Sequence, residues 1–335
     1  MRIYLTGATG YIGRALCRRL VAEGHEVRAL ARSAERAQPL AELGVATFPG
    51  DVTDRASLRE GMSGADWVIH AAADLDLNGP AGRMEAVNVG GSENVASLAQ
   101  KLGVPRLLSV SSVAYFGGSP DDGTPATEET PPRQPFPTRY SDTKHRGERA
   151  IRAWAARGLS VVTVYPSLVY GPPGKREGAN AILRQLLLGR FPALVGADRV
   201  ASWIHLDDVV DGIARALARA APGVAYLLAG EAVSVRALAA AVGRLAGVPT
   251  PRREVSVRTA RWALRLALPL YRLRGRRPPM PLTQLDSLAR HWRFDDTRAR
   301  RELDWSPRPL DQGLPPTLAY LAAAERARRA PAERG

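Results

Sequence analysis

The feature that most constrains the fold is a glycine-rich turn near the start of the chain. A strand is predicted over residues 2–6, the turn TGATGYIG occupies residues 6–13, and apolar side chains at helical spacing predict a helix over 15–23. Gly7 permits the sharp turn, Gly10 lets backbone N–H groups approach a pyrophosphate, and Gly13 lets the helix pack closely on the strand. The helix N-terminus adds the positive end of its dipole. The turn predicts a dinucleotide site with contacts from Gly7, Gly10, Tyr11, Ile12 and Gly13.

Strand and helix segments alternate from this turn to about residue 170. The predicted strands are 2–6, 25–30, 45–48, 67–70, 106–110 and 160–165, and the predicted helices are 15–23, 33–43, 56–62, 86–102 and 140–157. Such alternation produces βαβ units with right-handed crossovers. The expected fold class is α/β, a Rossmann doubly wound parallel sheet, in which ligands bind beyond the carboxyl ends of the strands.

The pattern changes after Gly171, where two prolines and a glycine interrupt the alternation. We expect an NADP-binding Rossmann domain over residues 1–170, with segments that return to it near 205–230. A smaller, mostly helical substrate-binding region is expected over 171–325, interleaved with the first domain, and a frayed tail over 326–335. Fold alone does not specify a substrate for such a region.

Composition narrows the class of protein. The 335 residues include one cysteine, Cys17, so no internal disulfide can form, and no cysteine–histidine cluster predicts a metal site. We therefore expect a cytoplasmic protein without a bound metal. The net charge is +14, but all 47 basic residues except Lys101, Lys144 and Lys175 are arginines spread along the chain. This distribution favours a solvated cationic surface over a nucleic-acid site.

The end of the second predicted strand bears on the choice of cofactor. An NAD site would place Asp or Glu there to bind the ribose 2′-hydroxyl, whereas this chain has Arg32, with Arg36 nearby. A guanidinium can pair with a 2′-phosphate through a charge-assisted, bidentate contact. The sequence therefore favours NADP(H) over NAD(H), with Arg32 as the residue that distinguishes them.

Three residues predict the catalytic chemistry. Tyr140 and Lys144 are four positions apart, so a helix presents both on one face. An ammonium beside the phenol is expected to lower its pKa, and Lys144 can also hydrogen-bond the nicotinamide ribose. Tyr140 could then exchange a proton with a carbonyl or alcohol oxygen. Ser112 follows the fifth predicted strand and could hold that oxygen, with Ser111 as the alternative.

With these residues assembled, the chain resembles the extended short-chain dehydrogenases/reductases, in the dihydroflavonol-reductase and 3β-hydroxysteroid-dehydrogenase branch. The resemblance runs from residue 1 to about 320. It rests on TGATGYIG, Gly50-Asp51-Val52, His70-Ala71-Ala72-Ala73, Asn88-Val89-Gly90, Tyr140 with Lys144, and YPSLVYGP at 165–172. It implies further cofactor contacts from Asp51, Val52, Ala71, Ala72, Ala73, Pro166 and Val169. It also implies that Asn88 supports the backbone of the active site.

The expected function is an NAD(P)-dependent oxidoreductase that moves a hydride between nicotinamide and a small carbonyl or alcohol substrate. A nucleotide-sugar epimerase or dehydratase is the alternative within the family. Such enzymes usually have a polar residue in place of Leu168 and an Arg-Asp pair in place of Ala201-Ser202, which here would leave a diphosphate desolvated without a partner. A third possibility is an NADP(H)-binding sensor without catalysis.

Of the remaining features, His205 and the segment 252–277 allow two interpretations each. His205 is either a substrate ligand or a structural residue at a helix start, and Cys17 is expected to be buried and inert. The arginine- and leucine-rich segment 252–277 either lies on an anionic membrane surface or packs on the core with solvated arginines. The resemblance implies a homodimer formed through the helices at 86–102 and 140–157.

Overall fold

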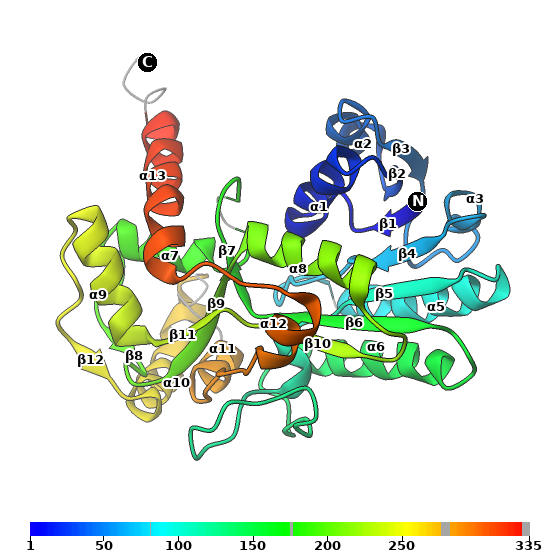
Figure 1. Cartoon of the computed structure of the whole chain (residues 1–335). Helices are drawn as coiled ribbons and strands as arrows, with labels where there is room; N and C mark the ends of the chain where they lie inside the picture. Colours follow the sequence, from blue (N-terminus) through cyan, green and yellow to red (C-terminus); the bar gives the residue numbers. More distant parts are fainter. Residues whose placement is uncertain (81, 175–176, 276–281, 330–335) are drawn as a thin grey trace.

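Seven parallel strands form the central sheet of the computed structural model, which describes residues 1–80, 82–174, 177–275 and 282–329. The strands are β1 (Arg2–Thr6), β2 (Glu26–Ala31), β3 (Ala46–Pro49), β4 (Trp67–His70), β5 (Arg106–Val110), β6 (Val161–Pro166) and β10 (Ala225–Leu228). Their order is β10-β6-β5-β4-β1-β2-β3, and each neighbouring pair runs parallel (Figure 1). Strand order reverses between β1 and β4, which confirms the predicted doubly wound sheet.

Helices cover both faces of this sheet (Figure 1). On one face lie α1 (Tyr11–Ala22), α2 (Ala34–Ala41) and α8 (Leu206–Arg219), and on the other α3 (Arg59–Met62), α5 (Gly91–Lys101) and α6 (Arg139–Ala155). Because side chains alternate along a strand, Leu5 packs with the first group of helices and Tyr4 with the second. The two buried layers fix the carboxyl ends of β1, β4 and β5 beside the N-termini of α1 and α6.

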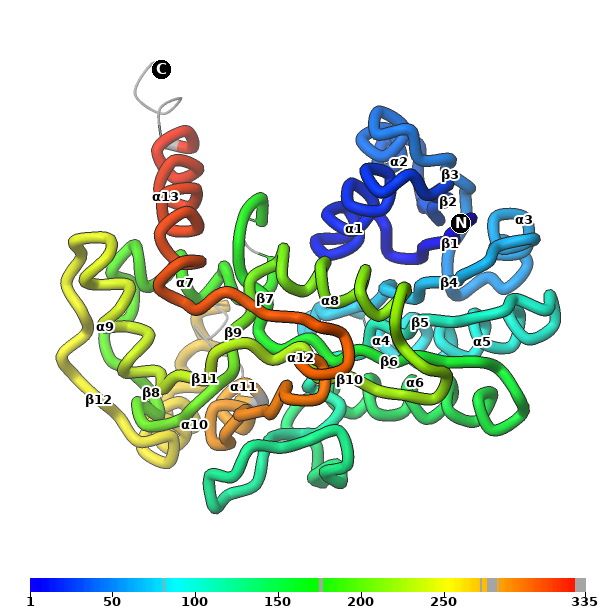
Figure 2. The backbone as a smooth tube through the Cα atoms, in the orientation of Figure 1, coloured from blue at the N-terminus to red at the C-terminus, as the bar shows by residue number. Residues whose placement is uncertain are grey.

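A smaller region stands beside the carboxyl edge of the sheet. Its strands are β7 (Leu168–Tyr170), β8 (Leu194–Val195), β9 (Val200–His205), β11 (Glu231–Ser234) and β12 (Glu254–Val255). They form a three-stranded sheet, β11-β9-β7, and a two-stranded sheet, β12-β8. Its helices are α7 (Asn180–Leu187), α9 (Val235–Ala246), α10 (Val257–Leu273), α11 (Leu282–Leu288) and α13 (Leu310–Arg329). Figure 2 shows the chain passing between the two parts, with α12 (Thr297–Leu303) beside the large sheet.

Several predicted elements differ from those observed. The helix predicted over 86–102 is divided into a π-helical turn η1 (Ala86–Gly90) and α5, and a short α4 (Arg83–Glu85) precedes it. Glycines at 90 and 91 weaken the helical preference there, and the side chain of Asn88 bonds to neighbouring backbone. The helix predicted over 56–62 begins only at Arg59. Ser57 and Asp54 hydrogen-bond nearby backbone groups, which competes with an earlier helical turn.

Helices predominate in the described residues after Gly171, as expected for the smaller region. The two small sheets described above were not predicted. A frayed tail was expected over 326–335, and in the structure α13 continues to Arg329, because alanine and arginine favour helix and Arg184 pairs with Glu325 at 2.6 Å. Residues 330–335 lie outside the described part. Across the residues that the structure describes, no helix combines the length and the apolar run needed to cross a bilayer.

The segment 252–277 was expected either to lie on an anionic membrane surface or to pack on the core. Within it, α10 lies against α11 on one side and exposes large apolar side chains on the other. Residues 276 and 277 of this segment lie outside the described residues. Contact with α11 therefore accounts for only one side of this helix.

Candidate active site

The glycine-rich turn has the geometry needed for a dinucleotide. Gly7 has φ +76°, and a Cβ there would lie 2.6 Å from the carbonyl oxygen of Ala71, so only glycine fits between β1 and the end of β4. A Cβ on Gly13 would overlap the backbone of Gly7. The N-terminus of α1 at Gly10 receives no side-chain cap, and its first turn contains no acidic residue. Its N–H groups and dipole are therefore suited to a pyrophosphate, which fits a dinucleotide at this position.

The other expected cofactor residues lie around this turn. The backbone N–H of Ala71 donates to the carbonyl of Thr6 at 3.1 Å, so Ala71, Ala72 and Ala73 continue from the end of β4 beside the turn. Asp51 follows β3, and its Oδ1 accepts hydrogen bonds from the backbone and hydroxyl of Thr53, both at 2.9 Å. Val52 is buried. Pro166 ends β6 and Val169 lies within β7, and both are buried at the carboxyl edge of the sheet.

Arg32 follows β2 directly and is exposed. Within the described residues its guanidinium has no ion-pair partner, whereas the neighbouring Ser33 caps α2 by accepting a hydrogen bond from the N–H of Arg36. An exposed, unengaged guanidinium beyond the second strand can reach an anion bound near the turn. This position is compatible with contact between Arg32 and the 2′-phosphate of NADP(H). The preference for NADP(H) over NAD(H) stays a prediction.

Tyr11 has a contact that the sequence did not predict. Its hydroxyl donates to the carbonyl of Gly171 at 2.5 Å and accepts a hydrogen bond from Nδ2 of Asn180 at 3.2 Å. The same amide group of Asn180 donates to Gly171 and Gly174, while its Oδ1 accepts from the N–H of Gly171. Tyr11 and Asn180 thus tie the glycine-rich turn to the loop that enters α7.

The three predicted catalytic residues come together. Thr138 caps α6 by accepting a hydrogen bond from the N–H of Ser141 at 3.1 Å, so α6 presents Tyr140 and Lys144 on successive turns. Ser112 follows β5 and begins a 3-10 turn, η2 (Val113–Phe116), and its hydroxyl hydrogen-bonds Tyr140. Lys144 Nζ donates to the carbonyl of Val110 at 3.3 Å, at the end of the same strand.

Burial sets the protonation of these groups. It raises the pKa of Tyr140 to about 12, and the hydrogen bond with Ser112 opposes that rise. The pKa of Tyr140 is thus raised overall, although Lys144 was expected to lower it, because desolvation of the phenolate dominates. Burial also lowers the pKa of Lys144 to about 8, against the influence of Glu148 one turn further along α6. At neutral pH the phenol therefore keeps its proton, and Lys144 is close to its titration point.

Buried polar residues hold this arrangement in place. Asn88 donates to Thr143 of α6 at 3.0 Å and binds the backbone of Asp74 through both ends of its amide. His70 lies between Thr6 Oγ1, at 2.8 Å from Nδ1, and Ser92 Oγ, at 3.3 Å from Nε2. Burial, together with the charge of Lys144, lowers the pKa of His70 to about 3, so it stays neutral. These bonds connect α6, η1 and β4.

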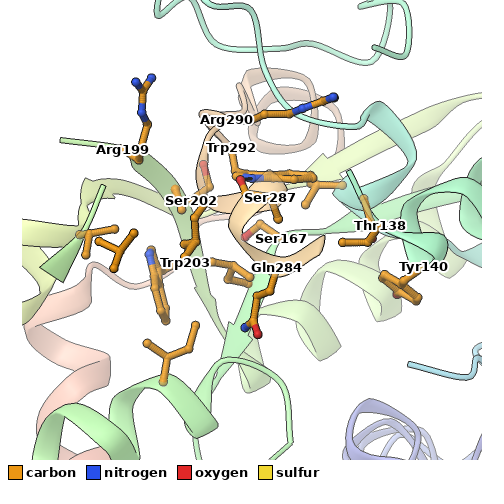
Figure 3. Close-up of a pocket in the computed structure, with 18 of the residues that line it drawn as sticks. Thr138, Tyr140, Ser167, Arg199, Ser202, Trp203, Gln284, Ser287, Arg290 and Trp292 are labelled. Atoms are coloured by element: carbon orange, nitrogen blue, oxygen red, sulfur yellow. Dashed lines mark hydrogen bonds between the residues drawn. The ribbon is translucent and has the colours of Figure 1, made fainter. Parts of the chain in front are cut away.

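A cavity of about 630 Å3 opens beside Ser112 and Tyr140 (Figure 3). Ser112 lines it, whereas Ser111 is buried outside the lining, so the geometry favours Ser112 over its neighbour. Apolar side chains make up most of the wall. They include Leu77, Val113, Leu168, Leu186, Phe191, Leu194, Val200, Ala201, Trp203, Leu238, Leu288 and Trp292.

Three charged residues line the cavity; Asp76 is exposed and accepts a hydrogen bond from the N–H of Asn78 at 3.0 Å, and the two arginines are engaged elsewhere. Arg290 donates to the carbonyls of Gly117 and Pro135, each at 2.5 Å, and Arg199 lies 2.9 Å from His291 Nε2. In Figure 3 both arginines lie at the top of the view, apart from Tyr140 at the lower right. With Leu168 and Ala201 also on the wall, the cavity next to Tyr140 has an apolar character that suits an uncharged ligand.

Sequence reasoning missed much of this cavity. Trp203 and Ser202 come from β9, Gln284 and Ser287 from α11, and Trp292 from the segment that follows. No local pattern marks these residues, because long-range pairing of the short strands brings them to Tyr140. His205, by contrast, is structural, since its Nδ1 caps α8 by accepting from the N–H of Asp207 at 3.2 Å. Cys17 is buried, and burial raises the pKa of its thiol to about 12. In the described part of the chain, no cluster of acidic, histidine or cysteine side chains is suited to a metal ion.

Comparisons with known proteins identify the family of this chain. The model of the NAD dependent epimerase/dehydratase family matches residues 3–229. A 4-hydroxy-2-methyl-3-oxo-4-farnesyl-3,4-dihydroquinoline-1-oxide ketoreductase of Stigmatella aurantiaca is 32% identical over 93% of this chain and 94% of its own. A 3 beta-hydroxysteroid dehydrogenase/Delta 5-->4-isomerase of Mycobacterium tuberculosis is 28% identical over 96% of this chain and 90% of its own. The crystal structure of gox2253 has a TM-score of 0.83 and 29% identity, covering 97% of this chain and 98% of that one.

Proposed function

The chain belongs to the NAD-dependent epimerase/dehydratase family, in the reductase-like and 3β-hydroxysteroid-dehydrogenase-like branch of the extended short-chain dehydrogenases/reductases, and we propose that it is an NADP(H)-dependent oxidoreductase of apolar ketones or the matching alcohols. The observation that carries the proposal is the meeting of Ser112 and Tyr140 at one end of an apolar cavity, with Lys144 one turn further along α6 and bonded to the carbonyl of Val110. The named relatives include a ketoreductase and a hydroxysteroid dehydrogenase, which supports this reaction class.

The residues have separate roles in the proposed reduction. When bound, the cofactor supplies the hydride that the carbonyl carbon accepts. Tyr140 gives its proton to the carbonyl oxygen, and its raised pKa keeps that proton available at neutral pH. Ser112 hydrogen-bonds the same oxygen and orients it toward the phenol. Lys144 holds the nicotinamide ribose and stabilises the phenolate that Tyr140 becomes.

The reaction is tested by removing the Tyr140 hydroxyl. Tyr140→Phe should lower the rate of NADPH oxidation with an apolar ketone about 100- to 10,000-fold, because the proton donor is lost. NADPH binding, measured by fluorescence titration, should stay within a few-fold of the unsubstituted protein. Ser112→Ala should also slow turnover, and Ser111→Ala is the matched control because its hydroxyl lies outside the cavity lining. Unchanged turnover in Tyr140→Phe would remove Tyr140 from the mechanism, and binding of NADPH without turnover of any ketone or alcohol would favour a sensor.

The cofactor preference has its own test. Arg32→Ala should weaken NADPH binding about 10- to 100-fold, because a charge-assisted contact to the 2′-phosphate is lost, and should leave NADH binding unchanged. Arg18→Ala on the exposed side of α1 removes the same charge away from the end of β2 and serves as control. Equal losses for NADPH and NADH would show that Arg32 does not read the 2′-phosphate.

A nucleotide-sugar epimerase or dehydratase is the second candidate, and the family name supports it. The apolar wall at Leu168 and Ala201 weighs against it, since a diphosphate placed there would lose its hydration without gaining a charged partner. Calorimetric titration with UDP-sugars distinguishes the two. Binding in the micromolar range, together with NAD that stays bound through purification, would favour the epimerase.

Pairing of two copies through α5 and α6 is also part of the proposal, as is a cytoplasmic location. These two helices pack against each other on one face of the sheet. Sedimentation velocity over a range of protein concentrations measures the oligomeric state. A monomer at all concentrations would contradict the pairing.

A further inference from the structure

One side of α10 exposes an unusual row of large apolar side chains. Trp262 is 64% exposed, Leu266 78%, Leu270 48% and Leu273 85%, and we call these four residues the α10 stripe. Large apolar residues exposed singly are ordinary, but a contiguous row on one helix marks a contact surface. The exposure of the α10 stripe is therefore not typical of a helix that only faces water.

The positions of the stripe residues follow helical geometry. At about 100° per residue, the four side chains occupy a sector about 80° wide on the outer side of α10. Arg258 and Arg265 flank this sector on one side and Arg274 flanks it on the other, and all three are exposed. The helix contains no acidic residue. Within the described residues, none of these three arginines has an ion-pair partner.

The inner side of α10 is already occupied. Leu264, Leu268 and Tyr271 are half-buried there, and α10 packs against α11. Arg261, which lies nearer this side, forms an ion pair with Asp286 of α11. Contact with the rest of the chain therefore fixes the orientation of α10 and directs the α10 stripe outward.

The positive charge of the flanking arginines distinguishes between two possible partners of the α10 stripe, a second copy of this chain and an anionic lipid surface. A second copy of this chain meeting the stripe about a twofold axis would bring the flanking arginines of both copies together, which is unfavourable. An anionic lipid surface offers acyl chains to the stripe and phosphate groups to the arginines. This combination of an apolar face, aromatic and leucine side chains, and flanking arginines is typical of helices that lie in the plane of a membrane interface.

We propose that α10 seats the protein on an anionic lipid surface, with the α10 stripe inserted among the acyl chains and Arg258, Arg265 and Arg274 at the headgroups. The seat adjoins the cavity wall. Gln284, Ser287 and Leu288 of α11 line the cavity, and β12, which leads into α10, pairs with β8, whose Val195 also lines it. The membrane contact is inferred from the geometry of α10 and is independent of the proposed reaction. It would bring the apolar cavity close to the lipid.

The first experiment measures binding of the full chain to vesicles by co-sedimentation. Vesicles of phosphatidylcholine mixed with phosphatidylglycerol should bind the protein at low salt, at least tenfold more tightly than vesicles of phosphatidylcholine alone. The double variant Leu266→Asn/Leu270→Asn should lose about tenfold or more in binding, because two inserted side chains are removed. Leu245→Asn on α9, where the leucine is 40% exposed, is the matched control and should bind normally. Both changes lie on exposed positions, and circular dichroism checks their folding.

Two further measurements make the result specific. Arg258→Gln/Arg265→Gln should weaken binding to the anionic vesicles and leave the weak binding to neutral vesicles unchanged. Brominated lipid should quench part of the tryptophan fluorescence, and Trp262→Phe should remove that part. Absence of vesicle binding, equal binding to both vesicle types, or insensitivity to the stripe variants would each overturn the proposal. So would self-association in solution that Leu266→Asn/Leu270→Asn abolishes, because the stripe would then belong to an interface between copies.

Discussion

Burial of Tyr140 and Lys144 determines which protons are available to the proposed reaction. The phenol keeps its proton far above neutral pH, whereas burial brings the pKa of Lys144 to about 8. Lys144 was expected to activate Tyr140 by lowering its pKa, and the structure instead shows two buried groups whose neutral forms are favoured. The lysine therefore titrates in the range where the enzyme would be assayed.

This position of the lysine predicts how ketone reduction depends on pH. Lys144 is protonated below about pH 8 and neutral above it, and only the ammonium stabilises the phenolate formed when Tyr140 gives up its proton. The turnover number should therefore be constant below that pH and should fall as pH rises through it. The measurement is kcat for ketone reduction across this range, at saturating NADPH. In Lys144→Arg the residual rate should lack this decline, because a guanidinium stays charged. A decline that persists in Lys144→Arg would assign the titration to another group.

Among the secondary-structure elements, the local sequence pattern predicted those strands whose own residues favour a buried strand. Strands such as Trp67–His70 and Arg106–Val110 were predicted at their observed bounds, because short apolar runs between turns are typical of buried parallel strands. The strands β7, β9 and β11 were missed, since pairing between segments about 30 residues apart stabilises them and their own sequences carry no alternation. For the same reason Ser112, Tyr140 and Lys144 were found from motifs, while the wall residues Trp203 and Trp292 were not.

The close contact between α6 and η1 holds the catalytic helix in place and can be tested. A Cβ on Gly147 of α6 would overlap the carbonyl oxygen of Asn88, so no larger residue fits without moving the helix. Gly147→Ala should lower the free energy of unfolding by about 1–3 kcal/mol, as overpacking does, and should reduce kcat by displacing Tyr140 and Lys144. Chemical denaturation and steady-state kinetics measure the two effects.

Gly90 of η1 provides the control for this change. A Cβ at Gly90 meets no atom within 4 Å, so Gly90→Ala should leave activity unchanged and should raise the free energy of unfolding by about 0.5–1 kcal/mol. If Gly147→Ala and Gly90→Ala changed the free energy of unfolding and kcat equally, the loss of glycine flexibility would explain both results. The close contact between Gly147 and Asn88 would then have no effect of its own.

At the scale of the whole molecule, the cofactor turn and the substrate region are joined by one buried cluster of hydrogen bonds. Tyr11 comes from the glycine-rich turn, and Asn180 begins α7, which contributes Ile182 to the cavity wall. Asn180 is fully buried and bonds three backbone groups in the loop between them. The cofactor and the substrate would therefore each contact an element that this cluster holds.

The cluster predicts a coupling between Tyr11 and Asn180 that a double-mutant cycle can measure. Tyr11→Phe should cost about 1 kcal/mol of unfolding free energy, the usual net value of one hydrogen bond. Asn180→Ala should cost about 3 kcal/mol or more, because it leaves the N–H of Gly171 and the C=O of Gly174 unpaired, while the C=O of Gly171 keeps only the Tyr11 hydroxyl. Combining the two should cost less than their sum by at least about 0.5 kcal/mol, since both remove the same contact. Tyr320→Phe is the control, because that hydroxyl donates to Pro173 in the same loop from an exposed position and its loss should cost less than Tyr11→Phe. Strict additivity of Tyr11→Phe and Asn180→Ala would mean that the turn and the loop are held independently.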